Sequence, residues 1–317
     1  MDIVSTAKIS AKRQNQLQNK FPAHRFQFFE HMDHVTEAAL AKADVLLTYG
    51  EDLTPAVVGN MPRLKWIQVL SAGIDAMPFD ILKKRNILVT NARGIHGIQM
   101  AEYALGMILS LVRRSFHFYD LQKQRRWDRS VRVDEAYGKT LGIVGYGAIG
   151  SEMAKRAKAF GMHVIALKKN VDVHSQYVDE LVSIEGKEKL FRQSDFIVVL
   201  LPLTPETEYF VGKEALQMMK PSAYLINMAR GKVIDEEALL QQVKAHKLAG
   251  AVLDVFSEEP LPEDHPFWQM ENIMITPHMS GRSPQYMQRA MDIFLTNLTS
   301  FPDKKRMVNV IDLDRKY

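Results

Sequence analysis

Three polar residues with complementary chemistry follow apolar runs in the C-terminal half of the sequence. Arg230 lies in NMARG (227–231), Glu259 in DVFSEEP (254–260) and His278 in TPHMSG (276–281). A guanidinium group can hold a carboxylate in a forked, charge-assisted geometry. An imidazole ring can give or take a proton near neutral pH, and a carboxylate on its other nitrogen fixes the ring and stabilises its charged form. Taken singly, each residue is more typical of a solvated surface or loop position, so the inference depends on the presence of all three after strands.

A glycine-rich turn upstream of these residues indicates the cofactor. The segment LGIVGYGAIG (141–150) is an apolar strand that runs into G-x-G-x-x-G and then into a helix expected over residues 149–160. Gly145 would allow a tight turn, Gly147 would let the backbone approach a pyrophosphate, and Gly150 would let the helix pack on the strand. The strand–turn–helix context favours a dinucleotide site over a turn that binds nothing. Together with the three polar residues, this turn indicates hydride transfer to or from a 2-keto or 2-hydroxy acid.

The charge at the end of the following strand indicates which dinucleotide binds. An acidic residue there accepts hydrogen bonds from the ribose 2′-hydroxyl of NAD, whereas a basic residue accommodates the 2′-phosphate of NADP. Lys168 and Lys169 occupy this position, and the next acid is Asp172. Because lysine lacks the bidentate fork of arginine, the pair predicts a preference for NADP that leaves NAD open. The alternative is that one or both lysines merely solvate the strand end.

The elements that must position these residues alternate between strand and helix, which indicates an α/β fold with parallel sheets. The expected strands span residues 2–6, 25–29, 45–48, 66–69 and 87–90, and then 141–145, 163–167, 196–201, 223–227, 250–255 and 273–276. The second series fits a doubly wound dinucleotide-binding domain. Arg230, Glu259 and His278 follow its later strands, at the carboxyl ends where open parallel sheets place their ligands.

A long apolar segment connects the two series of strands. Residues 100–118 predict one helix that is more apolar than a single buried stripe requires, which suggests a domain junction or a subunit interface. The charged segment 121–139 is expected to be a connection without core elements, and residues 285–301 predict a final helix.

Composition limits the classes of protein that fit. A chain of 317 residues favours two domains, and the absence of cysteine excludes disulfides and thiolate chemistry. The net charge of +4 comes from short scattered basic runs, which argues against a nucleic-acid-binding face. The most apolar stretch, 100–112, contains Glu102 and is too short for a membrane span, and no secretory signal is visible at the N-terminus. We expect a cytoplasmic protein that binds neither membrane nor nucleic acid.

The motifs as a set resemble the D-isomer-specific 2-hydroxyacid dehydrogenase family over nearly the whole chain. They are SAGID (71–75), NARG (91–94), MAEYALGMILSLVRR (100–114), GYGAIG (145–150), LPLTPET (201–207), INMARG (226–231), DVFSEEPLP (254–262) and TPHMSG (276–281). The resemblance implies a Rossmann-type cofactor domain inserted in a smaller flavodoxin-like α/β substrate domain. It implies boundaries at 1–98 plus 287–317 for the substrate domain and 99–286 for the dinucleotide-binding domain, with an active site in the cleft between them.

The resemblance also implies roles for individual residues. Arg230 would be the catalytic arginine, Glu259 the histidine-orienting acid and His278 the general acid/base. Backbone N–H groups at Ala72 and Gly73 would bind the substrate carboxylate, with Tyr49, Arg230 and His278 beside them. The cofactor would contact Gly145, Tyr146, Gly147, Ala148, Ile149, Gly150, Lys168, Lys169, Leu201, Pro202, Thr207, Met228, Ala229, Arg230, Asp254, His278 and Ser280. Asp254 would lie near the nicotinamide carboxamide, and no metal is expected.

The chain departs from the family's NAD-specific members, which carry an acid near Lys168. It therefore looks like the NADP-using branch related to glyoxylate and hydroxypyruvate reductases. Because members of the family form homodimers, the resemblance also implies a homodimer. Tyr49 and His96, which would set specificity in the substrate domain, match no subgroup, so the sequence leaves the 2-keto acid and the physiological direction open.

Two other functions remain open on the same fold. A formate or phosphite dehydrogenase is one, although formate enzymes carry an amide where this chain has Glu259. A dinucleotide-sensing binding protein is the other, although those proteins add recognition clefts and tails, whereas this sequence ends soon after its last expected helix.

Overall fold

The computed structural model describes residues 1–74, 76–172 and 174–314. The chain forms two compact units. Unit 1 comprises Met1–Ile95 and Pro284–Tyr317, and unit 2 comprises His96–Ser283. Each boundary lies three residues before the one expected from the sequence, because the long helix begins at Gly97 and packs within unit 2.

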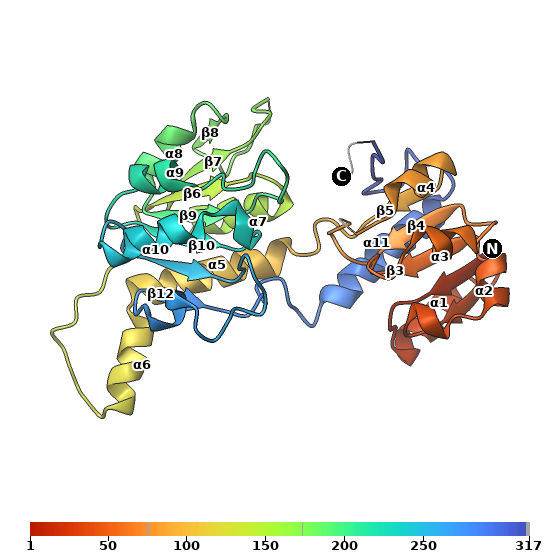
Figure 1. The fold of residues 1–317 in the computed structure, drawn as a ribbon, viewed down its shortest axis with the longest axis horizontal. Helices are drawn as coiled ribbons and strands as arrows, with labels where there is room; N and C mark the ends of the chain where they lie inside the picture. The colour runs from red at the N-terminus through yellow and green to blue at the C-terminus, as the bar shows by residue number, and fades with distance from the viewer. Residues whose placement is uncertain (75, 173, 315–317) are drawn as a thin grey trace. The chain divides into compact units, whose positions relative to one another are not determined.

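Unit 1 is built on a five-stranded parallel sheet with strand order β2-β1-β3-β4-β5, the flavodoxin-like arrangement. Its strands are β1 (Asp2–Ser5), β2 (Arg25–Phe28), β3 (Val45–Thr48), β4 (Trp66–Val69) and β5 (Leu88–Thr90) (Figure 1). β3 and β4 are buried along their whole length, as central strands covered on both faces must be.

Helices cover both faces of this sheet. The first face carries α2 (Glu37–Lys42), α3 (Pro55–Gly59) and α4 (Phe79–Lys84), and the second carries α1 (Ala11–Lys20) and α11 (Tyr286–Ser300). A 3-10 turn spans Met32–His34. The C-terminal helix α11 packs through Phe294, whose ring lies 5.6 Å from that of Trp66. The last segment of the chain therefore completes the core of the first.

Unit 2 is built on a seven-stranded parallel sheet with order β12-β11-β10-β9-β6-β7-β8. Its strands are β6 (Thr140–Val144), β7 (His163–Leu167), β8 (Glu180–Val182), β9 (Phe196–Val199), β10 (Tyr224–Asn227), β11 (Gly250–Leu253) and β12 (Ile273–Ile275). Counted from β6, the first six strands follow the Rossmann order 3-2-1-4-5-6, with β12 added beside β11. The chain reverses direction across the sheet between β6 and β9, which is where such sheets bind ligands.

The helices of unit 2 form two layers. One face packs against α8 (Lys187–Gln193), α9 (Lys213–Met218) and α10 (Glu236–Lys244), and the other against α5 (Gly97–Val112) and α7 (Ala148–Ala159). Short 3-10 turns span Gly231–Val233 and Pro266–Gln269. The α/β architecture and both sheet orders confirm the fold class expected from the sequence.

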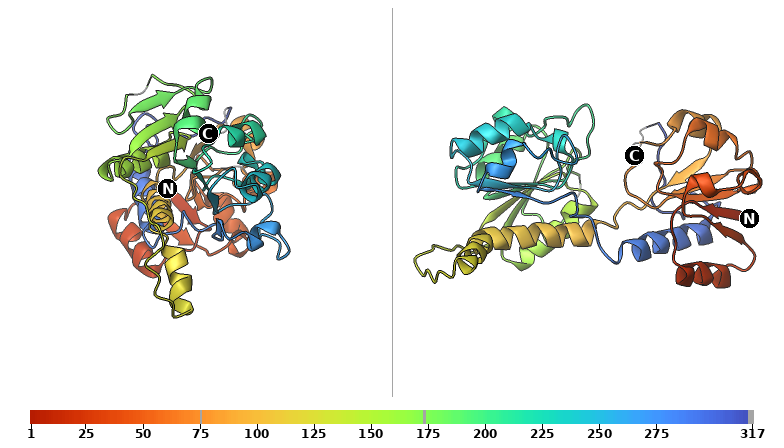
Figure 2. Two further views of the ribbon diagram at one scale, coloured as in Figure 1. Left: turned by 90° about the vertical axis from the view of Figure 1, so that its left-hand side faces the viewer. Right: turned by 60° about the horizontal axis from the view of Figure 1, so that its bottom comes forward.

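The prediction of one helix over residues 100–118 was wrong. Arg114 adopts a left-handed conformation with φ 54°, so the segment breaks into α5 and α6 (Ser115–Lys123). Figure 2 shows α6 and the segment after it projecting from the body of unit 2. The expected connection over 121–139 therefore begins inside α6, and the sequence prediction also missed the short edge strand β8.

Candidate active site

The glycine turn between β6 and α7 is shaped by two glycines. Gly145 has φ 108°, and a Cβ atom there would lie 3.1 Å from the backbone of Leu200 and of Leu201 at the end of β9. Gly150 faces the same turn from α7, and a Cβ atom on it would lie 2.9 Å from the carbonyl oxygen of Gly145. The Tyr146 N–H completes the turn by donating to Leu167 O at 2.8 Å. The turn thus lies between the ends of β7 and β9.

The residues of this turn fit a dinucleotide pyrophosphate. A Cβ atom on Gly147 would meet nothing within 4 Å, so a bulky group can approach the described backbone there. α7 begins at Ala148, Ile149 follows in its first turn, and the amide groups of a first helical turn have no helical acceptor. They and the positive end of the helix dipole are suited to phosphate.

Lys168 and Lys169 lie at the end of β7, as the sequence places them. The Lys168 side chain is half-buried, with Nζ 5.9 Å from the centroid of the Tyr146 ring. The Tyr146 hydroxyl in turn lies 2.7 Å from the Ser175 Oγ atom. Tyr146 therefore connects the glycine turn to the segment after β7, a link that the sequence pattern did not reveal.

The loop after β9 faces Lys169 through Glu206. Hydrogen bonds from the Thr204 hydroxyl and from its own backbone lower the pKa of Glu206, and the charge of Lys169 lowers it further. Thr207 closes this loop by donating its hydroxyl to Pro202 O at 2.6 Å. Leu201, the residue after Leu200, is half-buried beneath the loop.

His278 and Glu259 meet in a direct side-chain contact. The Nδ1 atom of His278 lies 2.7 Å from the Oε2 atom of Glu259, and both side chains are accessible to solvent, by 52% and 36%. The Phe256 N–H donates to the Glu259 Oε1 atom at 3.0 Å, which fixes the carboxylate. Because a carboxylate can only accept, Nδ1 carries the proton. The Nε2 atom is then the nitrogen that can exchange a proton with a ligand.

Asp254 holds the backbone that carries His278. Its side chain is fully buried and accepts from Thr276 Oγ1 at 2.5 Å, from Met279 N at 2.9 Å and from Ser280 N at 2.9 Å. The His278 N–H donates to the Asp254 carbonyl oxygen at 2.8 Å. These bonds hold His278 at φ 48°, a conformation that costs free energy for a non-glycine residue.

Arg230 follows β10 in an extended conformation and is exposed, whereas Met228 and Ala229 before it are buried. Its Nη1 atom donates to Ala229 O at 2.7 Å. A Cβ atom on Gly231 would overlap the Phe256 backbone at 1.9 Å, so the arginine segment packs directly against the segment that carries Glu259. The structure thus brings the segments of Arg230, Glu259 and His278 together at the carboxyl edge of one sheet.

His96 is the first residue of unit 2, whereas the sequence-based boundary after residue 98 places it in the substrate domain. It precedes α5, and its Nδ1 atom lies 3.3 Å from Gly281 O, in the loop that follows His278. Burial lowers the pKa of His96, and the positive charge of Arg230 lowers it further. Only the folded chain could reveal this proximity, because His96 and Gly281 are far apart in the sequence.

Tyr49, Ala72 and Gly73 lie in unit 1. Hydrogen bonds shape the loop after β4: Ser71 Oγ donates to Gly73 O at 2.7 Å, and Asn91 Nδ2 donates to Ala72 O at 2.8 Å. Tyr49, at the end of β3, is 37% exposed, and the burial of the rest of its ring raises its pKa.

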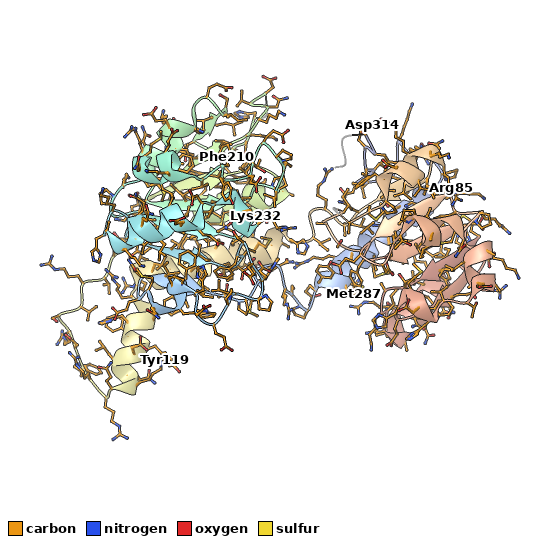
Figure 3. All side chains as sticks on the ribbon, viewed as in Figure 1. Arg85, Tyr119, Phe210, Lys232, Met287 and Asp314 are labelled. Atoms are coloured by element: carbon orange, nitrogen blue, oxygen red, sulfur yellow. The ribbon has the colours of Figure 1, made fainter. Side chains whose placement is uncertain are left out.

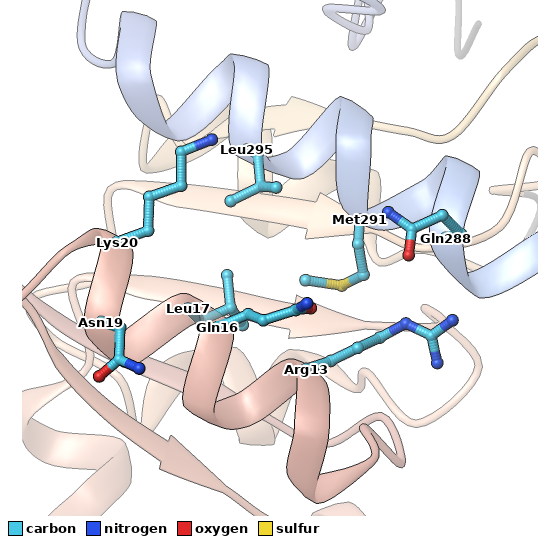
Figure 4. A pocket seen from close by; sticks show the side chains of 8 residues that line it. All are labelled: Arg13, Gln16, Leu17, Asn19, Lys20, Gln288, Met291 and Leu295. Carbon is cyan, nitrogen blue, oxygen red and sulfur yellow. The ribbon is translucent and has the colours of Figure 1, made fainter.

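A cavity of about 550 Å³ in unit 1 lies between α1 and α11 (Figure 4). Arg13, Leu17 and Met291 lie along it. None of the expected site residues lines it, so it is not the candidate active site.

Among the residues that the structure describes, no group of three or more metal-ligating side chains is placed to hold an ion. No helix in that part of the chain has both the length and the apolar character needed to cross a bilayer.

Sequence comparison places this site in a known class. Residues 105–280 match the family described as D-isomer specific 2-hydroxyacid dehydrogenase, NAD binding domain. A D-3-phosphoglycerate dehydrogenase from Methanocaldococcus jannaschii is 37% identical over 78% of this chain, which spans 47% of that relative's length. A glyoxylate reductase from Korarchaeum cryptofilum is 34% identical over 76% of this chain and 74% of its own.

Solved structures share the whole fold. A D-isomer specific 2-hydroxyacid dehydrogenase family protein from Aeromonas salmonicida is 32% identical, with a TM-score of 0.87 over 99% of both chains. A family member from Xanthobacter autotrophicus in complex with NADPH is 25% identical, with a TM-score of 0.83 over 100% of this chain and 99% of its own. A D-lactate dehydrogenase from Aquifex aeolicus in complex with NAD and lactic acid is 28% identical, with a TM-score of 0.76 over 98% of this chain and 99% of its own.

The fold, the glycine turn and these relatives define an NAD(P)-dependent oxidoreductase with a nicotinamide dinucleotide cofactor. The chain belongs to the D-isomer-specific 2-hydroxyacid dehydrogenase family, whose members act on small hydroxy or keto acids.

Proposed function

We propose that this protein reduces small 2-keto acids, such as glyoxylate or hydroxypyruvate, and that NADPH is its preferred reductant. The observation that carries the proposal is the 2.7 Å contact between His278 and Glu259, which follow strands of the same sheet that carries the glycine turn. Curated relatives named glyoxylate reductase support the substrate class. The two lysines at the end of β7, where NAD-specific members carry an acid, support the choice of cofactor.

We assign the dinucleotide to unit 2. The glycine turn, the start of α7 and the loop carrying Leu201, Pro202 and Thr207 would hold its phosphates, with Lys168 and Lys169 at the 2′-phosphate. Met228 and Ala229, together with Asp254 and Ser280, would line the nicotinamide end. When bound, the reduced nicotinamide supplies the hydride that the substrate carbonyl carbon accepts.

The protein's own residues would hold the acid and move the proton. Arg230 would bind the carboxylate and the carbonyl oxygen through its planar fork and so polarise the carbonyl. The Nε2 atom of protonated His278 would give its proton to that oxygen as the carbon accepts the hydride, which leaves a neutral imidazole and a hydroxyl group. Glu259 would keep Nδ1 protonated and the ring aligned throughout.

We propose unit 1 as the substrate-binding unit. The backbone N–H groups of Ala72 and Gly73, in a loop that Ser71 and Asn91 shape, would receive the carboxylate. Tyr49 would contact the substituent of the keto acid and so contribute to substrate choice.

We further propose a homodimer that forms through α6 and the segment after it. Tyr119 stands out from α6 (Figure 3), and it and Trp127 are 57% and 92% exposed. Phe116, Phe118 and Tyr137 add further exposed aromatic surface. Such a concentration of aromatic surface is typical of an interface, and the family resemblance implies a homodimer.

Turnover tests the proposed function directly. Glyoxylate, hydroxypyruvate and pyruvate are each mixed with the protein and either NADPH or NADH, and the absorbance of the reduced nicotinamide is followed. Oxidation of NADPH with at least one of the acids supports the proposal. Tight binding of NADPH without turnover of any 2-keto acid would identify a dinucleotide-sensing protein instead.

A further inference from the structure

A chain of hydrogen bonds connects α5 to the loop that carries His278. The Tyr103 hydroxyl lies 2.6 Å from Thr276 Oγ1, and Thr276 Oγ1 lies 2.5 Å from Asp254 Oδ1. Tyr103 projects from the middle of α5, Thr276 directly follows β12 and Asp254 directly follows β11. Three elements that are distant in the sequence therefore meet through two short contacts.

The direction of the protons in this chain follows from the acceptor at its end. The Asp254 carboxylate can only accept, so the single proton of the Thr276 hydroxyl points to Asp254. The Tyr103 hydroxyl must then donate to Thr276. Burial, followed by the charge of Asp254, raises the pKa of Tyr103 to about 12 despite the hydrogen bond with Thr276, so the phenol keeps its proton at neutral pH.

The Asp254 carboxylate, at the end of this series of hydrogen bonds, anchors the backbone of the loop that carries His278. Besides Thr276, the Asp254 carboxylate accepts the N–H groups of Met279 and Ser280, which flank His278 on its C-terminal side. His278 itself is held at φ 48°, which surrounding bonds must maintain. A carboxylate that loses one of its three donors holds that loop less firmly, and the His278 ring then spends less time in line with Glu259.

We propose that Tyr103 is a positioning residue for the reaction: it orients the Thr276 hydroxyl toward Asp254 and thereby fixes the loop that presents His278. This inference rests on the proposed acid/base role of His278. Tyr103 touches neither substrate nor cofactor in this account. Its removal should therefore lower kcat and leave the KM for the dinucleotide nearly unchanged.

Conservative substitutions test the hydrogen bonds from Tyr103 through Thr276 to Asp254 one at a time. Tyr103→Phe keeps the ring and removes the donor, and kcat should fall about 3- to 10-fold, the effect of one neutral hydrogen bond. Thr276→Val removes both bonds and should lower kcat at least as much, whereas Thr276→Ser should recover most of the loss. The double variant Tyr103→Phe/Thr276→Val should match Thr276→Val alone, because both changes break one chain.

A matched control separates positioning from general stability. Tyr224 begins β10, at the amino edge of the same sheet, and its ring stacks on Phe196. Tyr224→Phe should keep kcat at the wild-type value. The Tm of each variant is measured alongside, and a Tyr103→Phe enzyme with lower Tm but unchanged kcat overturns the proposal. Additive losses in the double variant overturn it too.

His278→Asn, measured in the same series, separates failure of the positioning role of Tyr103 from failure of the proposed function. An inactive His278→Asn enzyme together with an unaffected Tyr103→Phe enzyme removes the positioning role and leaves the proposed function intact. Full activity of His278→Asn removes the proposed function itself, whatever the Tyr103 variants show.

Discussion

The Nδ1 atom of His278 lies 2.7 Å from the Oε2 atom of Glu259, although the two residues follow different strands of the sheet. The carboxylate is fixed by the Phe256 N–H, and the histidine by the Asp254 carbonyl oxygen. Both members of the pair are thus anchored by backbone of the same segment. This arrangement leaves only Nε2 available for proton exchange.

Replacing Glu259 should reduce catalysis without loss of cofactor binding. Glu259→Gln keeps the size of the side chain but removes the charge that stabilises imidazolium, so we expect kcat for keto-acid reduction to fall about 10- to 100-fold. Steady-state kinetics at several pH values measure the change. Glu258→Gln, at the adjacent exposed carboxylate, is the control and should behave as wild type. Equal losses in the two variants would argue against a specific role for Glu259.

Replacing the lysine pair should change the choice of cofactor. In Lys168→Asp/Lys169→Ala a carboxylate faces the place of the 2′-phosphate, so the KM for NADPH should rise about 10-fold or more while that for NADH changes little. The single variants show whether both lysines take part. Lys155→Asp, on the exposed surface of α7, controls for overall charge. A parallel rise for NADPH and NADH would refute the 2′-phosphate role.

The lowered pKa of His96 should make the free energy of unfolding depend on pH, and His96→Gln should weaken that dependence. Burial, aided by the Arg230 charge, lowers this pKa in the folded state. The unfolded chain therefore binds more protons as the pH falls through the ordinary histidine pKa, so stability decreases toward acid pH. His96→Gln removes this term, and the free energy of unfolding should fall less between pH 7 and pH 5 than in the wild type.

Denaturant titrations at the two pH values measure this difference. His117→Gln replaces an exposed histidine and serves as the control, with an acid dependence like that of the wild type. A His96→Gln protein that loses as much stability on acidification as the wild type would show that His96 is not held neutral by its surroundings.

The aromatic surface of α6 and its following segment predicts assembly. If Trp127 lies at the centre of a dimer interface, Trp127→Ala should raise the dimer dissociation constant about 30-fold, the effect of losing an aromatic hot spot. Analytical ultracentrifugation over a range of concentrations measures it. Trp268→Ala replaces a half-exposed tryptophan elsewhere on unit 2 and should leave the dissociation constant unchanged. A monomeric wild-type protein would exclude the dimer at once.

The sequence predicted most of the fold, because glycines and apolar runs mark the strand ends of parallel α/β sheets well. It did not predict the break before α6, since Arg113 and Arg114 are good helix formers and no glycine or proline marks the end of α5, which the left-handed backbone of Arg114 brings about. β8 is a three-residue edge strand without fully buried residues, so it lacks the apolar run that identified the others.

The sequence predicted the residues of the candidate site and the pairing of Glu259 with His278, but not the hydrogen bonds that support them. Motifs pointed to Arg230, Glu259 and His278, yet the bonds from Tyr103 through Thr276 to Asp254 and the contact of His96 with Gly281 join residues that are distant in the sequence. Such contacts depend on how helices pack on the sheet. Local sequence patterns do not predict such packing.

The most direct test of the central claim is keto-acid turnover by His278→Asn beside the wild type, with NADPH affinity measured by fluorescence in both. We expect the wild type to oxidise NADPH with a small 2-keto acid. The variant should lose at least about 100-fold in kcat, the scale of one general acid, while it binds NADPH almost as tightly. A variant that retains full turnover would contradict the account.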